Sequence, residues 1–182
     1  MHGISGDTLD SERLIKKTLE ETDADLVGIT RLNEESIIIL AYAGSGRCDL
    51  KGLDKKAERA AEKIRCKGFN ARVVNANNGE GISLRKLAEE AGLGFIGRSG
   101  LLIAERFGPD VRLSGIITNI DLRPEKKSEA ESGCDGCRRC EDSCPAGAIV
   151  EKGVDKCRRH VENSGMERCT VCIDVCPFKE EW

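Results

Sequence analysis

Hydrophobic positions along the first two thirds of the chain predict alternating helices and strands. Short apolar, β-branched runs predict buried strands, and apolar residues spaced three and four apart predict helices. The expected strands are 24–30, 36–44, 70–78 and 112–122, and the expected helices are 9–22, 52–68 and 83–92. Gly68 is expected to end the second helix and Ser83 to cap the third. This alternation favours an α/β core with one sheet.

The pattern changes after residue 122. Residues 123–133 are polar and charged, and we interpret them as a linker or surface turn. Beyond residue 133 the chain has cysteine motifs and no longer shows regular apolar periodicity. Short helices and loops organised by metal are therefore expected there. The sequence therefore predicts two domains, an α/β core at 1–125 and a metal-binding module at 126–182.

Composition and charge narrow the class of protein. A net charge of −3 and a pI near 5.6 give no general reason to expect nucleic-acid binding. The first residues are polar and lack the apolar run of a secretory signal. The longest apolar stretch, residues 36–44, is too short to span a bilayer. We therefore expect a soluble, cytoplasmic protein without a membrane partner.

Cysteines carry the candidate chemistry. The chain has ten, and eight of them fall within its last 49 residues. In a reducing cytosol, clustered thiols predict metal ligands rather than disulfides. Cys48 and Cys66 stand apart from the others and are interpreted as free thiols.

The first cysteine motif has the spacing C-x₂-C-x₂-C-x₃-C-P and contains Cys134, Cys137, Cys140 and Cys144. This run is typical of bacterial ferredoxins, in which three cysteines bind one [4Fe–4S] cluster and the fourth binds the other. Pro145 suits the first turn of a helix, so a short helix is expected after it.

The second motif supplies only three cysteines, at positions 169, 172 and 176. By the same exchange, the last of these completes the first cluster and leaves the second cluster one ligand short. Cys157 is the only unused cysteine of the module and fills that place. The expected ligands are Cys134, Cys137, Cys140 and Cys176 for cluster 1, and Cys144, Cys157, Cys169 and Cys172 for cluster 2.

Zinc is an alternative occupant, because C-x₂-C pairs also build zinc ribbons. Zinc ribbons usually place their pairs in separate knuckles, whereas this chain has three cysteines in a row followed by Cys-Pro. His160 is a further metal-binding residue type, but cysteines already fill both sites. We therefore interpret His160 as a solvated helix residue.

Residues 91–103 contain a literal G-x-G-x-x-G at Gly92, Gly94 and Gly97. A dinucleotide fingerprint follows a strand and opens a helix. Here the glycines follow the expected helix 83–92, so the pattern does not predict a nicotinamide site.

Residues 84–124, followed by the double cysteine motif with its lone Cys157, resemble epoxyqueuosine reductases and the related reductive dehalogenases. The resemblance is specific over 83–182 and faint over 1–82. It implies an α+β protein: a shortened, nitroreductase-like α/β core with a remnant of a cobalamin-binding site, then a bacterial-ferredoxin-like module with two [4Fe–4S] clusters. In that family the clusters feed electrons to the corrinoid cobalt and use the same partition of ligands.

The resemblance also implies site residues. It places the glycine-rich stretch against the cofactor, where Gly94 and Gly97 would permit close backbone approach and Arg98 or Ser99 would meet a phosphate. The equal alternative is a tight structural turn with Arg98 on the surface. Asp49, one position late relative to the family's general acid, is the candidate catalytic acid, against an ordinary solvated loop aspartate.

We expect an iron–sulfur electron-transfer protein that passes single electrons from a soluble ferredoxin- or flavodoxin-type donor to a redox centre at the α/β core. One alternative is a small cobalamin-dependent reductase resembling epoxyqueuosine reductase, for which tRNA would be a partner. The other is a reductive activator of a partner corrinoid protein. Nucleic acid is expected only in the first of these alternatives.

Overall fold

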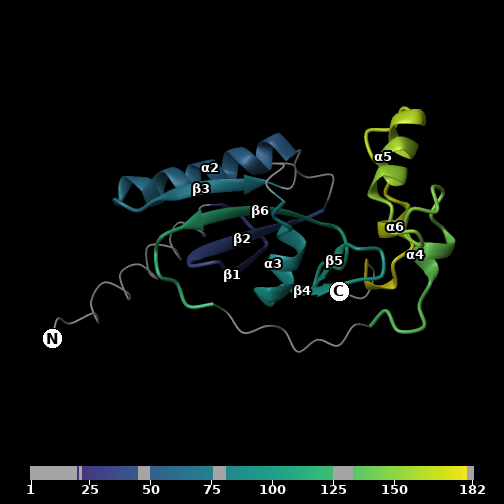
Figure 1. Cartoon of the computed structure of the whole chain (residues 1–182), viewed down its shortest axis with the longest axis horizontal. Helices are drawn as coiled ribbons and strands as arrows, with labels where there is room; N and C mark the ends of the chain where they lie inside the picture. The colour runs from purple at the N-terminus through teal and green to yellow at the C-terminus, as the bar shows by residue number, and fades with distance from the viewer. Residues whose placement is uncertain (1–19, 21, 45–49, 76–80, 125–132, 180–182) are drawn as a thin grey trace. The chain divides into compact units, whose positions relative to one another are not determined.

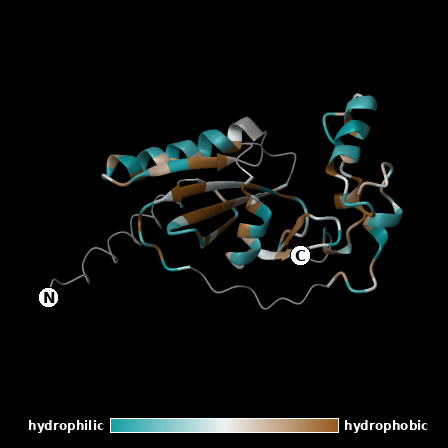
Figure 2. Cartoon of the chain, viewed as in Figure 1, coloured by the Kyte–Doolittle hydropathy of each residue, from teal (hydrophilic) through white to brown (hydrophobic). Residues whose placement is uncertain are grey.

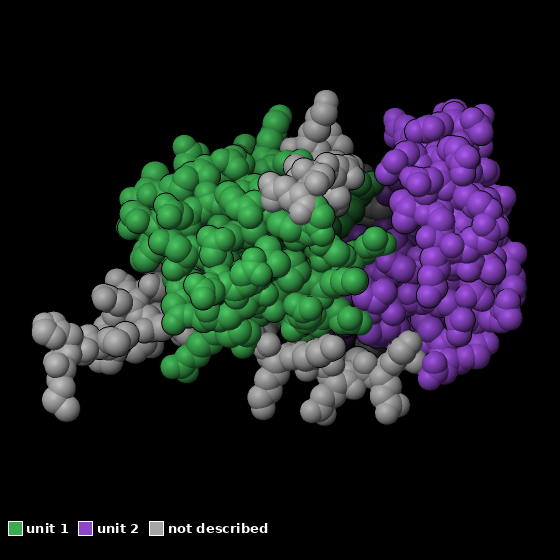
Figure 3. All heavy atoms as spheres, in the orientation of Figure 1, with its two compact units in different colours: residues 1–93, 112–128 green, residues 94–111, 129–182 purple. Residues whose placement is uncertain are grey.

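A computed structural model describes residues 20, 22–44, 50–75, 81–124 and 133–179. The chain divides into two compact units, residues 1–93 with 112–128 and residues 94–111 with 129–182 (Figure 3). The expected helix over 9–22 lies almost wholly outside the described residues, as does most of the expected linker. The expected domains 1–125 and 126–182 stay a prediction, because compactness does not test whether either part folds by itself.

A four-stranded sheet with the order β1-β2-β6-β3 forms the centre of the first unit (Figure 1). Its strands are β1 (Leu26–Leu32), β2 (Glu35–Ala43), β3 (Ala71–Asn75) and β6 (Val111–Thr118). β1 pairs antiparallel with β2, and β3 pairs antiparallel with β6. All four expected strands therefore form. β1 and β2 pair antiparallel because the connection between them is far too short for a crossover helix.

Helix α2 (Leu50–Cys66) packs on one face of this sheet. Leu53, Ala57 and Ile64 of the helix share a buried cluster with Leu40 of β2 and Ile116 of β6. Alternate residues of a strand point to the same face, which explains why even-numbered positions of both strands join this cluster. Figure 2 shows these strands as hydrophobic and much of the helix as hydrophilic.

The short helix α3 (Leu84–Glu90) contacts β1 and β2 and buries Leu84, Leu87 and Ala88. Ser83 occupies its N-cap position, but the side chain makes no capping hydrogen bond, so the expected side-chain cap is absent. Gly28 of β1 allows the end of this helix to approach. A Cβ atom at Gly28 would lie 2.8 Å from the Cβ of Ala91 and 2.9 Å from its carbonyl oxygen.

The second unit contains a hairpin that the sequence pattern did not reveal. β4 (Gly94–Ile96) and β5 (Leu102–Ala104) pair antiparallel and form a two-stranded sheet. The remaining elements are α4 (Arg139–Asp142), α5 (Val154–Asn163), α6 (Val171–Asp174) and the 3₁₀ helix η1 (Pro177–Lys179). No helix among the described residues is long and apolar enough to cross a membrane.

The short helix expected after Pro145 does not form, and residues 145–150 make turns instead. Gly147 has φ +59°, a left-handed conformation that interrupts a right-handed helix. Gly68 has φ +88° directly beyond α2, as expected for a glycine that ends a helix.

The close approach at Gly28 makes a testable prediction. Gly28→Ala should lower the free energy of unfolding by about 1–3 kcal/mol, because the added methyl group would overpack against the backbone of Ala91. Gly153→Ala is the control, since its methyl group would meet only the Lys156 side chain, at 3.5 Å. Urea unfolding followed by far-UV circular dichroism measures both. Equal stability of the Gly28→Ala variant and the natural chain would contradict this packing.

Candidate metal centre

Five cysteine side chains from both sequence motifs line one cavity of the second unit. Two lie in the loop before α4, one in α4, one in α6 and one directly before η1. They are Cys134, Cys137, Cys140, Cys172 and Cys176. All four cysteines expected to hold cluster 1 are therefore at this cavity, although Cys176 is far from the others in the sequence.

The cysteines expected to hold cluster 2 are electrostatic neighbours. Partial desolvation, and then the charges of Cys169 and Cys144, raise the pKa of the Cys157 thiol, although the residue as a whole is exposed. Burial, and then the charges of Cys169 and Cys157, raise the pKa of Cys172 to about 11. Cys140 also acts on Cys172, so the two expected sets of ligands lie next to each other.

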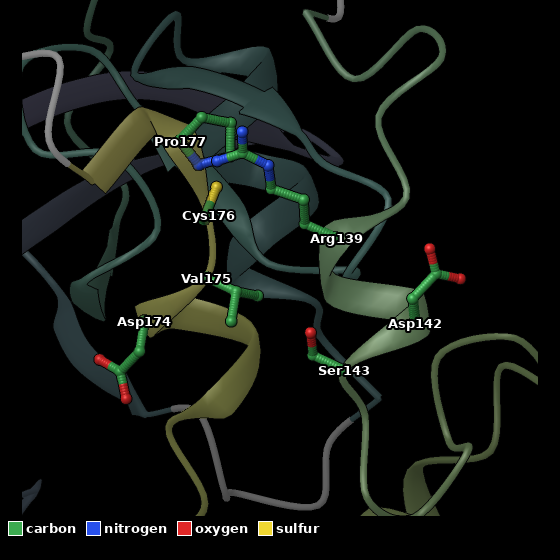
Figure 4. A pocket seen from close by; sticks show the side chains of 7 residues that line it. All are labelled: Arg139, Asp142, Ser143, Asp174, Val175, Cys176 and Pro177. Atoms are coloured by element: carbon green, nitrogen blue, oxygen red, sulfur yellow. The ribbon is translucent and has the colours of Figure 1, made fainter.

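The cysteine motifs are repeated in structure as well as in sequence. Helices α4 and α6 are single turns that contact each other, and each ends two residues before a Cys-Pro pair. A hollow of about 470 Å³ lies between the ends of these helices, and Arg139 reaches from α4 toward Cys176 and Pro177 (Figure 4). Asp142 and Asp174 line it from equivalent positions of the two motifs. The second motif is therefore a counterpart of the first and not a fragment of it.

Cys144 differs from the other thiols in its surroundings. Burial raises its pKa, but hydrogen bonds from the backbone N–H groups of residues 146–149 outweigh this effect and hold the pKa below its ordinary value. The turns that replace the expected helix after Pro145 thus direct backbone donors toward this sulfur. Such donors stabilise a thiolate, the form of cysteine that binds metal.

The cysteine-bearing segment has almost no hydrophobic core. Among residues 133–179, Cys140 and Ala148 are the buried hydrophobic side chains, and neither α5 nor α6 buries a residue. Val150 and Val154 are 60% and 65% exposed. Small domains of fewer than about 70 residues usually need disulfides, a metal or a partner to be stable. None of the described cysteines forms a disulfide.

The described residues do not form a site for a single metal ion. Within the described ranges, no group of three or more His, Cys, Asp or Glu side chains is placed to hold a metal ion. His160 lies in the last turn of α5, as a helix residue, and Cys66 is exposed.

The residues expected to contact a cofactor in the glycine-rich stretch are engaged within the second unit. Gly94 has φ +148°, and a Cβ atom there would lie 2.0 Å from the carbonyl oxygen of Ile103. A Cβ atom at Gly97 would lie 2.8 Å from Cγ1 of Ile103 and 3.5 Å from Sγ of Cys134. Ser99 Oγ accepts a hydrogen bond from the backbone N–H of Leu101 at 3.4 Å. The hairpin and the adjacent cysteine thus require small residues at both glycines, and contact of this stretch with a cofactor stays a prediction.

Arg98 forms an ion pair that the sequence did not indicate. Its Nη1 lies 3.1 Å from Oε1 of Glu141, and Nε of Arg138 lies 3.3 Å from Oε2 of the same carboxylate. The hydrogen bond and charge of Glu141 raise the pKa of the Arg98 guanidinium. Glu141 is a site residue that sequence reasoning missed. No signal in the sequence separates it from an ordinary acidic surface residue.

The hairpin also holds the end of the second motif. The rings of Phe95 and Phe178 pack edge to face, with centroids 5.6 Å apart and planes at 81°. A Cβ atom at Gly108 would lie 2.3 Å from the carbonyl oxygen of Phe178, so the backbones meet closely there. Phe178 follows Cys176 by two residues, and this contact therefore anchors the fourth expected ligand of cluster 1.

Four further residues are candidates for a functional site, two of them outside the described residues. Asp49, the expected catalytic acid, and Cys48 lie outside the described residues. Arg112 and Ser114, two residues apart on β6, have buried polar atoms, Nε and Oγ, with no hydrogen-bond partner in the described part of the chain. A buried polar atom left without a partner costs about 1–3 kcal/mol, so a polar ligand would be stabilising there.

Comparison with known proteins identifies relatives of this chain. No protein-family model matches it. It is 34% identical over 137 residues to the tetrachloroethene reductive dehalogenase of Sulfurospirillum multivorans, a match that covers 63% of this chain and 26% of the relative. It is 33% identical over 153 residues to the epoxyqueuosine reductase of Aliivibrio fischeri, covering 74% of this chain and 39% of the relative.

Solved structures show the same likeness of fold. A selenomethionine-labelled epoxyqueuosine reductase matches with a TM-score of 0.76 and 19% identity, over 96% of this chain and 67% of that one. A catabolic reductive dehalogenase matches with a TM-score of 0.77 and 20% identity, over 98% of this chain and 33% of that one.

The fold therefore defines a mixed α/β protein with a small antiparallel sheet, similar to the folds of these reductases. The chain is a shorter relative of the epoxyqueuosine reductases and reductive dehalogenases, which confirms the resemblance found in the sequence. It spans 26% and 39% of the length of the two curated relatives described above.

Because residues 133–179 have almost no hydrophobic core, their stability should depend on bound metal. Chelation of metal from the purified protein should speed amide hydrogen exchange in α5 at least tenfold, because little apolar burial remains to hold that helix. Exchange in β2, which is buried along nearly its whole length, should stay slow in the same sample. Exchange measured by mass spectrometry tests both regions. Undiminished protection of α5 in metal-free protein would contradict the account.

Proposed function

We propose that the protein holds two [4Fe–4S] clusters and passes single electrons from a soluble ferredoxin- or flavodoxin-type donor to a redox centre. The observation that supports this most is the cavity where Cys176 joins the three leading cysteines of the first motif. An exchange of last cysteines between two motifs is the ligand pattern of two-cluster ferredoxins. A ferredoxin-like arrangement of the second unit belongs to this proposal.

The donor chemistry suits clusters. Thiolates are the usual ligands of iron–sulfur clusters, and each thiolate binds its own iron. Five cysteines around one shared cavity, three of them from a single run, favour a cluster over a single zinc. Backbone N–H groups directed at the Cys144 sulfur add the hydrogen bonds that commonly surround cluster thiolates.

Bound clusters would supply one-electron oxidation and reduction, and the chain would set the route. Cys157 is exposed, so an electron donor would approach the second set of thiols from its side. Cys140 is buried and acts electrostatically on Cys172, so the two sets are neighbours along the route. The names of the relatives, which are reductases, favour a redox function.

The acceptor belongs to the first unit in our proposal. Gly94, Gly97, Arg98 and Ser99, the four residues expected to contact a corrinoid, have close contacts within the second unit, and their contact with a corrinoid stays a prediction. The buried Nε of Arg112 and Oγ of Ser114 on β6 are the described groups that would receive a polar ligand. We therefore assign no step to cobalamin.

The two alternatives share the electron-transfer step and differ in the acceptor. A small reductase would reduce a substrate at the core, and an activator would reduce the cobalt of a partner corrinoid protein. One solved relative is an epoxyqueuosine reductase with a tRNA stem loop. tRNA would be a partner of this chain only if it retained that reductase activity.

Cys157→Ser tests the proposal through the ligand partition. Protein purified anaerobically should contain about eight irons and eight sulfides per chain. Cys157→Ser should retain about half of each, because it removes one ligand of cluster 2 only. Cys66→Ser is the matched control and should retain all of its iron, since Cys66 is an exposed residue of α2. Two zinc ions and no sulfide in the natural chain would overturn the proposal.

A further inference from the structure

We propose that the charges of Arg98 and Glu141 set the reduction potential of cluster 1. Arg98 raises this potential and Glu141 lowers it. The inference rests on the proposed function, because it concerns the cluster that the cavity cysteines would hold. It gives Arg98 a role toward the cluster in place of the cofactor phosphate expected from the sequence.

The hairpin fixes Arg98 beside the cysteines. The turn that carries it is closed by two backbone hydrogen bonds, from Gly97 N–H to the Leu101 carbonyl at 2.9 Å and from Gly100 N–H to the Gly97 carbonyl at 2.8 Å. The residue before Arg98 lies against Cys134, and Arg98 itself lines the cavity of the five cysteines. Its guanidinium is thus held at the cavity by the fold and by its ion pair.

Glu141 is the partner that holds this guanidinium. It follows Cys140 in α4, and its side chain is only 12% exposed. A carboxylate with so little access to water is costly unless it is paired, and here Arg98 and Arg138 both meet it. Arg138 also lies 3.8 Å from Oδ1 of Asp142, and Arg139 lines the same cavity as Arg98. Arg98 and Glu141 therefore each add one charge, of opposite sign, beside the cavity cysteines.

The second motif lacks this arrangement. Ile173 stands where the first motif has Glu141, one residue after the motif's helical cysteine. An uncharged side chain there requires no guanidinium. The two clusters would therefore lie in different electrostatic surroundings, and the ion pair would act mainly on cluster 1.

The sign of the effect follows from Coulomb's law. Reduction adds a negative charge to a cluster, so a nearby cation favours the reduced form and raises the potential, whereas an anion lowers it. Arg98 lines the same cavity as Cys134 and Cys140, so its charge would act on a cluster held there.

The test is a redox titration of the loaded protein followed by electron paramagnetic resonance. In Arg98→Gln we expect the ratio of oxidised to reduced cluster 1 at a fixed potential to rise about tenfold, a fall of about 59 mV in midpoint for one electron. In Glu141→Gln the midpoint should rise, while Arg98→Lys should keep the natural value. Cluster 2 should be unaffected, and in a Cys157→Ser background the remaining signal should show the same shifts.

The ion pair of Arg65 and Glu58, both on α2, provides matched controls. Arg65→Gln and Glu58→Gln should leave both midpoints unchanged. Shifts of the same sign in Arg98→Gln and Glu141→Gln, or no shift in either, would overturn the inference. If Arg98→Gln does not load iron, a raised midpoint in Glu141→Gln together with a natural value in Arg98→Lys supports it, and any other result refutes it. Iron and sulfide are measured first. If the natural chain holds no clusters, the proposed function fails; if it holds them and the midpoints do not shift as expected, only this inference fails.

Discussion

The cysteine-bearing segment of the second unit has very little apolar burial to stabilise it. In residues 133–179, buried hydrophobic side chains are limited to Cys140 and Ala148, and three short helices are joined by turns. Burial raises the pKa of Cys140 and Cys172, so these thiols favour their neutral form unless a cation is bound beside them. A metal that takes thiolate ligands would both remove this penalty and bridge the helices.

The hairpin β4–β5 extends this constraint to the glycine-rich stretch. Gly94 and Gly97 let the hairpin close on itself and lie against Cys134, and the packing of Phe95 on Phe178 fixes the chain just beyond Cys176. The same turn presents Arg98 to the cavity. The glycine-rich stretch is thus part of the cysteine-bearing unit, and its contact with a cofactor stays a prediction.

The sequence predicted the parts of the fold that depend on apolar burial. The strands β1, β2, β3 and β6 and the helices α2 and α3 lie where hydrophobic periodicity placed them. The prediction from hydrophobic periodicity failed where glycines determine the backbone conformation or where the strands are very short. β4 and β5 have only three residues each, too few for a periodic signal, and the left-handed Gly147 turns the expected helix into a series of turns. Both features depend on contacts and dihedral angles that alternation of residue types does not encode.

At the candidate site, the spacing of the cysteines was more informative than hydrophobic periodicity. The spacing assigned Cys176 to cluster 1, and Cys176 lies at the cavity of the other three ligands of that cluster, which Cys172 of cluster 2 also lines. The partition of ligands stays a prediction. Spacing could not find Glu141, because an acidic residue beside a cysteine is ordinary until its burial and its two arginine partners are seen. Asp49, proposed from resemblance, falls outside the described residues, so the catalytic acid stays a prediction.

Iron anomalous scattering from crystals grown without oxygen tests the central claim most directly. We predict two four-iron clusters, with Cys176 bound to the cluster of Cys134, Cys137 and Cys140, and Cys144 bound to the other. Anomalous density for single zinc ions, or Cys144 bound to the same cluster as Cys134, would contradict the exchange of ligands between the two motifs.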